Sequence, residues 1–421
     1  MDFFHTPAAK ALAAQGTPLT ALPTPPPPPP GHPIAAVPST IDDTTLNGFP
    51  DSLGRPRACP QGSVPIVRTT AARIQSAGGL EQFLSRRKQH HPAPPLGECN
   101  AATDPSGYAH VVENSAVNAS NANITLVAAQ WSLYSPLTSP LDGDIGHSVA
   151  QIWLSSHCGM SLLGTCSGKT SDPSCMNTVE VGSVSYTQDN HLYMLVYSTN
   201  DGYSDVANNG QFMNTTLGPS FVQTSTYLAN EQDITQYTTY PSMASAAPNV
   251  MVANVELEQG VGWWVYVGIQ SSSYSSGNWL GYFPSSLYTT GFATSANSFQ
   301  MGGEVYEVTN ETNGASGPLW LTRMGSGATA GFANYVFPSA FFQDGEVLAN
   351  GTWNSTFYLG QGSDSTVGST VPSDYGLLSP PGSGVNFYFG TIRHTFNNSD
   401  YGLGFWSAQN CPLTRICGLK S

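Results

Sequence analysis

The fold class of this chain is clearest in two runs, NTVEVGSVSY at residues 177–186 and HLYMLVYS at residues 191–198. Both are short, rich in β-branched and aromatic residues, and followed by Asp and Asn, as is typical of β-strands. Similar runs are ITLVAAQW (124–131), HSVAQIWL (147–154), NVMVANVEL (249–257), GWWVYVGI (262–269) and GEVYEV (303–308). Because strands are this dense and no long amphipathic helix interrupts them, we predict an all-β fold, an antiparallel two-sheet β-sandwich.

Charge and composition divide the chain into three parts. Residues 1–95 carry 8 basic and 5 acidic side chains, whereas residues 96–421 have a net charge of -17, within a whole-chain charge of -14. Residues 1–50 contain the proline run 25–30 and predict a disordered, extended leader. Residues 51–95 predict a small docking unit that ends in the exposed basic linker RRKQHHPAPP, residues 86–95. The folded domain is expected over residues 105–421.

The composition also excludes several classes of protein. An acidic chain with only 13 Lys and Arg cannot bind nucleic acid through its phosphates. No apolar run approaches the roughly 18–20 residues that a membrane span needs. The low charged fraction of 10% favours a secreted protein, and so do sequons at Asn118, Asn123, Asn214, Asn310, Asn350, Asn354 and Asn397. Residues 1–16, MDFFHTPAAKALAAQG, do not form a recognisable signal peptide.

Cysteine spacing favours disulfides over a metal site. The seven cysteines contain no C-x-x-C pair, and the spacing of Cys158, Cys166 and Cys175 matches no common zinc pattern. Cys411 and Cys417 predict a short disulfide, and two of the middle three could close a loop. An odd count leaves one thiol free or paired between chains.

Two glutamates differ from the other acidic residues, which mostly occupy turn-like sequence. Glu180 and Glu304 lie inside uncharged strand-like runs, with Gly182 and Gly302 two positions away on the same strand face. Such glycines would leave room beside each carboxylate for an extended ligand. A carboxylate among strand residues is partly desolvated, which favours its protonated form. The pair is therefore a candidate for acid–base chemistry, against the alternative of two ordinary edge-strand glutamates.

Familiar catalytic motifs are missing from the sequence. It contains no G-x-S-x-G, no H-E-x-x-H, no Walker loop and no Asp-Thr-Gly or Asp-Ser-Gly. The nine histidines show no diagnostic spacing and are expected to be surface or satisfied residues.

Longer motifs resemble the neprosin family. ACPQGSVPIVRTT (58–70) resembles the CPEGT-I-PIRRT signature of that family. In family order follow GYAHVV (107–112), AQIWL (150–154), NTVEVG (177–182), YSTNDGY (197–203), GPSFVQT (218–224), NWLGYFPSSLY (278–288), MGGEVYE (301–307) and RMGSG (323–327). The resemblance covers roughly residues 55–340. It departs at Glu180-Val-Gly-Ser183, where plant members usually read E-A-G-W, and beyond about residue 340.

This resemblance implies a glutamic peptidase with a jelly-roll-like two-sheet sandwich and an N-terminal activation segment, here residues 51–95, that is removed. It implies Glu180 and Glu304 as the catalytic residues, protein or peptide substrates, cleavage after proline at acidic pH, and no metal or other cofactor. Asn177 and Gln300 are further candidates for holding the substrate oxyanion.

Two other readings remain open on the sequence alone. A glycoside hydrolase would also use a glutamate pair, with Trp131, Trp153, Trp263, Trp264 and Trp279 as sugar platforms instead of core residues. A non-catalytic wall- or matrix-binding module would need neither glutamate.

Overall fold

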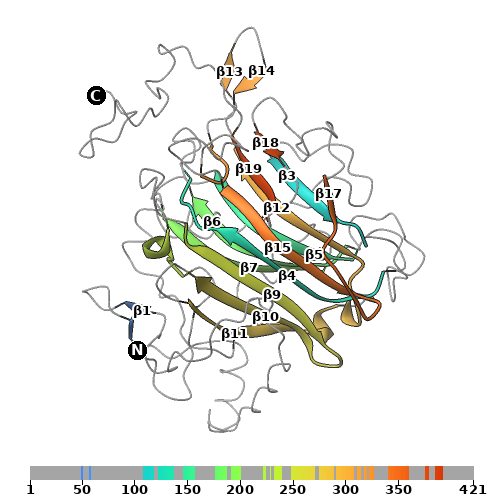
Figure 1. Cartoon of the computed structure of the whole chain (residues 1–421). Helices are drawn as coiled ribbons and strands as arrows, with labels where there is room; N and C mark the ends of the chain where they lie inside the picture. Colours follow the sequence, from blue (N-terminus) through green and yellow to red (C-terminus); the bar gives the residue numbers. More distant parts are fainter. Residues whose placement is uncertain are drawn as a thin grey trace.

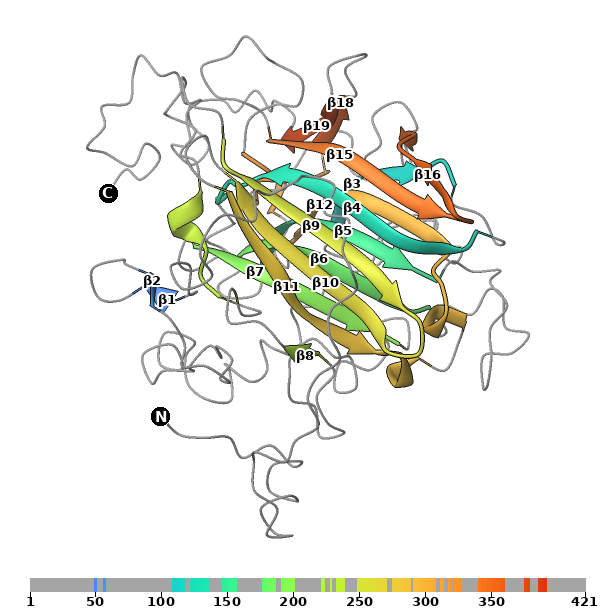
Figure 2. The same cartoon turned by 60° about the horizontal axis from the view of Figure 1, so that its bottom comes forward.

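The chain forms two antiparallel sheets that lie face to face (Figures 1 and 2). The computed structural model describes residues 49–50, 56–57, 108–117, 122–136, 146–156, 176–186, 191–200, 221–223, 228, 232–238, 248–270, 275–288, 291–307, 311–313, 317–319, 322–326, 340–359, 375–378 and 385–391 of the 421. Within these ranges there is no α-helix, only the 3-10 turns η5 (Thr235–Tyr237), η6 (Ser285–Leu287) and η7 (Gly291–Ala293). None of the described helices could cross a membrane.

The smaller sheet has six strands and holds both candidate glutamates. Its order is β17 (Phe357–Leu359), β3 (Tyr108–Ser115), β12 (Ser298–Tyr306), β5 (His147–Ser155), β6 (Thr178–Tyr186) and β7 (Leu192–Thr199). Strand β5 therefore separates β12 from β6 and pairs with each of them over nine residues.

The larger sheet has nine strands and packs against one face of the smaller one. Its path runs through β18 (Tyr375–Leu378), β19 (Val385–Thr391), β15 (Ala340–Ala349), β4 (Ile124–Ser132), β9 (Val250–Glu258), β10 (Gly262–Gln270), β11 (Ser275–Pro284) and β8 (Val222–Gln223), with β16 (Thr352–Asn354) on β15. Two separate two-stranded ribbons are β1 (Phe49–Pro50) with β2 (Pro56–Arg57), and β13 (Glu311–Asn313) with β14 (Gly317–Leu319).

Side chains point alternately to the two faces of each strand, and those on the inner faces form one core between the two sheets. Every second residue of β6, such as Val179 and Val181, joins buried residues of the larger sheet, such as Trp131 and Val265. Trp131 has no exposed surface and lies 5.7 Å, ring centroid to ring centroid, from Phe342. Truncating a buried tryptophan to alanine typically costs about 3–5 kcal/mol. The remaining residues of β6, including Glu180, face away from this core.

The predicted all-β antiparallel two-sheet sandwich is confirmed. All seven runs predicted as strands are strands, within a few residues at their ends, and GEVYEV is the second half of the longer β12. The other parts of the prediction lie outside the described residues: the leader and residues 51–95 apart from β1 and β2, all seven cysteines, and the chain beyond residue 391.

Candidate active site

The two candidate glutamates share the face of the six-stranded sheet that points away from the core. Glu304 on β12 pairs with Val149 of β5, and Glu180 on β6 pairs with Trp153 of the same strand. Directly paired residues and residues an even number apart lie on one face. Both carboxylates are 0% exposed. They are two strand spacings apart, roughly 10 Å across the sheet, and four positions apart along β5.

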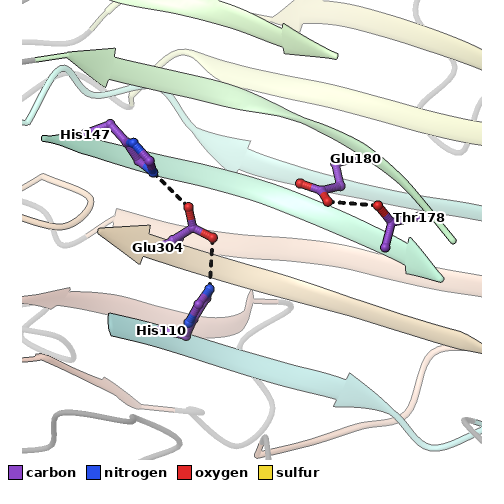
Figure 3. A network of polar contacts seen from close by, with 5 residues as sticks. All are labelled: His110, His147, Thr178, Glu180 and Glu304. Carbon is purple, nitrogen blue, oxygen red and sulfur yellow. Dashed lines mark hydrogen bonds and ion pairs between the residues drawn. The ribbon is translucent and has the colours of Figure 1, made fainter. Parts of the chain in front are cut away.

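Glu304 lies between two imidazoles (Figure 3). His110 on β3 has its Nε2 2.9 Å from Oε2, and His147 on β5 has its Nε2 2.8 Å from Oε1. Burial by itself would raise the pKa of Glu304, but the hydrogen bonds and charges of His110 and His147 outweigh it and hold the pKa below its ordinary value. The expectation that burial favours the protonated form was therefore wrong for Glu304.

Glu180 is held in a different way. The hydroxyl of Thr178 donates to its Oε1 at 2.9 Å, as the second pair of sticks in Figure 3 shows. When the side-chain amide of Gln151 is oriented by its hydrogen-bond network, Nε2 lies 3.3 Å from Oε2 of Glu180. These two donors are neutral. A hydroxyl can either donate to an ionised carboxylate or accept from a protonated one, so Thr178 can serve both states of Glu180.

Gly182 and Gly302 lie on the same sheet face as the glutamates, as predicted, and the structure gives a second reason for glycine at these two positions. Gly302 and Gly182 both pair with Gln151, so no side chain stands on either side of that glutamine. A Cβ on Gly302 would lie 2.0 Å from the carbonyl oxygen of Val111, and one on Gly182 would lie 2.5 Å from Cβ of Gln151. Close approach of neighbouring strands therefore requires glycine at both positions, whatever occupies the space above them.

The two predicted amides have different positions. Gln300 lies on the same face as the glutamates and donates through Nε2 to Oδ1 of Asn114. Asn177 is three positions from Glu180, so alternation turns it to the other face, and its backbone N–H donates to Oγ of Ser156 at 2.7 Å. The structure does not bring Asn177 to the glutamates.

Sequence reasoning missed His110 and His147. Both had been expected to be surface histidines or histidines satisfied by structural hydrogen bonds. They are instead buried and contact a candidate catalytic residue. Their position within the strand-like runs GYAHVV and HSVAQIWL was the available signal, because a histidine inside a buried strand needs a polar partner. Among the residues that the structure describes, no group of three or more His, Cys, Asp or Glu is arranged to hold a metal ion.

Aromatic side chains lie around Glu304 on the outer face of the six-stranded sheet. The rings of Tyr108 and Tyr306 are 4.4 Å apart between centroids, and His110 lies 6.0 Å from Trp153. Burial raises the pKa of Tyr108 well above its ordinary value, and the charges of Glu304, Tyr306 and Glu180 add to the effect. Tyr108 therefore keeps its proton throughout the physiological pH range.

Fold and site together define an all-β sandwich with two buried carboxylates on the outer face of one sheet. The family model for Neprosin matches residues 146–391, more than half of the chain. The chain therefore belongs to the neprosin family, and the resemblance inferred from its motifs is confirmed. None of the curated protein sequences compared with it matches significantly.

Similar solved structures include two peptidases of low sequence identity. One is scytalido-glutamic peptidase with a peptide-based transition state analog, 8% identical, covering 68% of this chain and 97% of that one, with a TM-score of 0.29. Another is SCP-B, a member of the Eqolisin family of peptidases, in complex with the tripeptide Ala-Ile-His. It is 7% identical, covers 68% of this chain and 97% of that one, and has a TM-score of 0.30.

Proposed function

We propose that this chain is an acid endopeptidase of the glutamic type, with Glu304 as general base and Glu180 as general acid. The observation that carries the proposal is the unequal support of two carboxylates on one sheet face. Two imidazoles contact Glu304. Glu180 is instead contacted by the Thr178 hydroxyl, which can donate or accept a hydrogen bond, and by the Gln151 amide. Paired carboxyl groups in environments that favour different protonation states are the usual basis for dividing acid and base roles. Membership of the neprosin family supports the same reaction class.

In the proposed reaction, ionised Glu304 takes a proton from a water molecule as the water oxygen attacks the scissile carbonyl carbon. Protonated Glu180 then gives its proton to the leaving nitrogen as the carbon–nitrogen bond breaks. The two glutamates are two strand spacings apart across the sheet and four positions apart along β5, roughly 16 Å between their backbones, so an extended peptide and a water would lie between the groups once the site opens. Thr178 supports Glu180 before and after the transfer because its hydroxyl can donate or accept.

Cleavage after proline is the finer part of the proposal. The resemblance to the neprosin family supports it, and the flat rings of Tyr108 and Tyr306 beside Glu304 are suitable surfaces for a proline ring. The alternative of a sugar-binding face loses two of its platforms, because Trp131 and Trp263 belong to the core between the sheets.

We also propose that the protein is made as a latent precursor and exported. Neither glutamate has exposed surface in the 421-residue chain, so a substrate cannot reach them without a rearrangement. Removal of the segment 51–95 would provide one. Export is supported by the sequons at Asn123 and Asn350, whose side chains are exposed.

The test is digestion of casein and of proline-containing peptides at pH 3–5 by acid-treated protein. Glu180→Gln and Glu304→Gln should each lower kcat by at least about 1,000-fold, because one remaining carboxyl group cannot perform both roles. Glu346→Gln on β15 is the matched control, since it changes a glutamate of the other sheet. Near-normal cleavage by either active-site variant would refute the function, and products without a proline at the cut would refute only the specificity.

A further inference from the structure

Gln151 lies at the midpoint between the two glutamates. Glu304 pairs with Val149 and Glu180 with Trp153, and Gln151 lies two positions from each on the same face of β5. In Figure 3, β5 is the strand that runs between the two glutamates. A peptide bond reached by both carboxyl groups must therefore pass close to this side chain.

The amide of Gln151 is held from one side only. Its neighbours across the sheet, Gly302 and Gly182, have no side chains. Its Oε1 accepts a hydrogen bond from Nε1 of Trp153 at 3.2 Å, and its Nε2 donates to Glu180 at 3.3 Å. An amide nitrogen carries two hydrogens, so one N–H of Gln151 remains for a group bound above the glycines.

A buried amide fixed in this way is a ready donor for a developing negative charge. Gln151 is 0% exposed, and hydrogen bonds are stronger in such surroundings than in water. Its orientation is set by Trp153 before any substrate binds, so little reorganisation is needed during the reaction. Gln300 lies four positions from Glu304 on β12 and is not between the two glutamates, and Asn177 faces the opposite side. Gln151 is therefore the amide best placed for this role.

We infer that Gln151 is a third catalytic residue, which donates its free N–H to the scissile carbonyl oxygen. This inference rests on the proposed function of Glu180 and Glu304. As the water oxygen bonds to the carbonyl carbon, the carbonyl electron pair moves to oxygen, and Gln151 stabilises the resulting oxyanion. When the carbon–nitrogen bond breaks, the carbonyl re-forms, Glu304 keeps the proton from water, and the nitrogen leaves with the proton from Glu180.

The first experiment is steady-state kinetics of Gln151→Met, which keeps an unbranched side chain of similar length but has no donor. We expect kcat to fall about 100- to 1,000-fold while KM changes less than threefold. The matched control is Gln130→Met, a buried glutamine of β4 in the larger sheet, whose Oε1 accepts from Nε2 of Gln343 on the neighbouring strand β15. It should leave kcat within about twofold.

Gln151→Glu separates a catalytic donor from a structural role. A protonated glutamic acid has an O–H in place of the lost N–H, whereas an ionised one has no donor and repels the oxyanion. The variant should therefore regain kcat relative to wild type as pH falls from 5 to 3 while its free energy of unfolding relative to wild type stays constant, because a purely structural defect of the added charge would be relieved in both quantities. If Gln151→Met unfolds, this pH response still decides the question.

Comparing the Gln151 variants with the two glutamate variants distinguishes failure of the role inferred for Gln151 from failure of the proposed function. If Glu180→Gln and Glu304→Gln are inactive but Gln151→Met retains kcat within threefold, the role of Gln151 is overturned and the glutamic mechanism stands. A Gln151→Glu variant whose activity relative to wild type does not rise towards pH 3 overturns it too. If the glutamate variants remain active, the proposed function fails, and the inference fails with it.

Discussion

Thr178 and Glu180 lie two positions apart on β6, and the Thr178 hydroxyl donates a 2.9 Å hydrogen bond to the Glu180 carboxylate. The contact is possible because residues i and i+2 of a strand share a face. It contrasts with Glu304, whose partners come from two neighbouring strands and are both imidazoles. Glu180 is thus supported partly from its own strand and partly by Gln151 of β5, whereas the support of Glu304 depends on correct pairing of three strands.

Thr178→Val should lower kcat about tenfold and destabilise the protein by about 1–3 kcal/mol. Valine keeps the β-branched shape but leaves a buried carboxylate oxygen without this donor. The measurements are kcat on a peptide substrate and the free energy of unfolding in urea. Thr125→Val on β4 removes a hydroxyl from the other sheet and, in protein made without N-glycosylation so that loss of the Asn123 sequon has no effect, should change neither quantity appreciably. Unchanged kcat in Thr178→Val would remove the support role assigned to this hydroxyl.

His110→Phe and His147→Phe should each move the acid limb of the pH–activity profile to higher pH. Glu304 has a pKa below its ordinary value because of these histidines, so losing either ring nitrogen raises the pKa and protonates the base at a higher pH. Phenylalanine keeps a ring of similar shape. The measurement is kcat/KM between pH 2.5 and 6.

The same contacts predict how stability depends on pH. A carboxyl group whose pKa is lowered in the folded state stabilises the fold above its unfolded pKa, and this contribution disappears as pH falls through the folded value. The two histidine variants should therefore be less stable than wild type at neutral pH, where this contribution is missing, and should lose less stability than wild type as pH falls below the ordinary glutamate value of 4.5. His191→Phe is the control, because His191 is exposed and pairs with Asp233. An acid limb that stays in place in both variants would contradict the proposed role of Glu304.

The fold was predictable to the extent that each strand carries its own signal. Runs such as GWWVYVGI have the composition of a strand wherever they pair. Pairing order has no such local signal, because β12 pairs with β3 and β5 from distant parts of the chain. The two glutamates could be singled out from local context, whereas the contact between His110 and Glu304 joins residues 194 positions apart. Gln151 was missed for the same reason, since its importance comes from the register of β5 with both neighbours.

Gly302→Ala should destabilise the sandwich by about 1–3 kcal/mol or more, because the added Cβ would meet the backbone of β3 2.0 Å away. A backbone carbonyl cannot move aside without disturbing the pairing of β12 with β3 that holds His110 against Glu304. The measurements are urea denaturation and kcat.

Gly260→Ala provides the comparison for that variant. Gly260 has φ of +79° but no atom within 4 Å of an added Cβ, so only backbone strain of about 1 kcal/mol is expected. If Gly302→Ala is no less stable than Gly260→Ala, the close approach of β3 does not explain the glycine at residue 302.

Activity should survive EDTA and reagents directed at serine or cysteine, because the proposed mechanism uses two carboxyl groups and a water. The measurement is casein digestion at pH 4 with and without each reagent. Inhibition by EDTA that added zinc reverses would contradict the mechanism and direct attention to Cys158, Cys166 and Cys175.

The full chain should be inactive at pH 7 and should be trimmed on acidification. Residues 1–95 carry a charge of +3 and residues 96–421 a charge of -17, so the two parts attract each other at neutral pH. Below about pH 4, Asp and Glu become protonated while Lys and Arg keep their charge, and His90 and His91 at the boundary become positive. The attraction then weakens, and the basic linker at residues 86–95 becomes accessible to cleavage.

The expected product begins between Gln89 and Asp104, since a peptidase with proline preference can cut after Pro92, Pro94 or Pro95. N-terminal sequencing over time at pH 3–4, with activity measured in parallel, tests this. If the removed segment covers Glu180 and Glu304, which are buried in the 421-residue chain, activity should rise only as the shorter product accumulates. If Glu180→Gln stays untrimmed unless wild-type enzyme is added, the cut is autocatalytic. Full activity of the untrimmed chain at neutral pH would show that burial of the glutamates does not make the precursor latent.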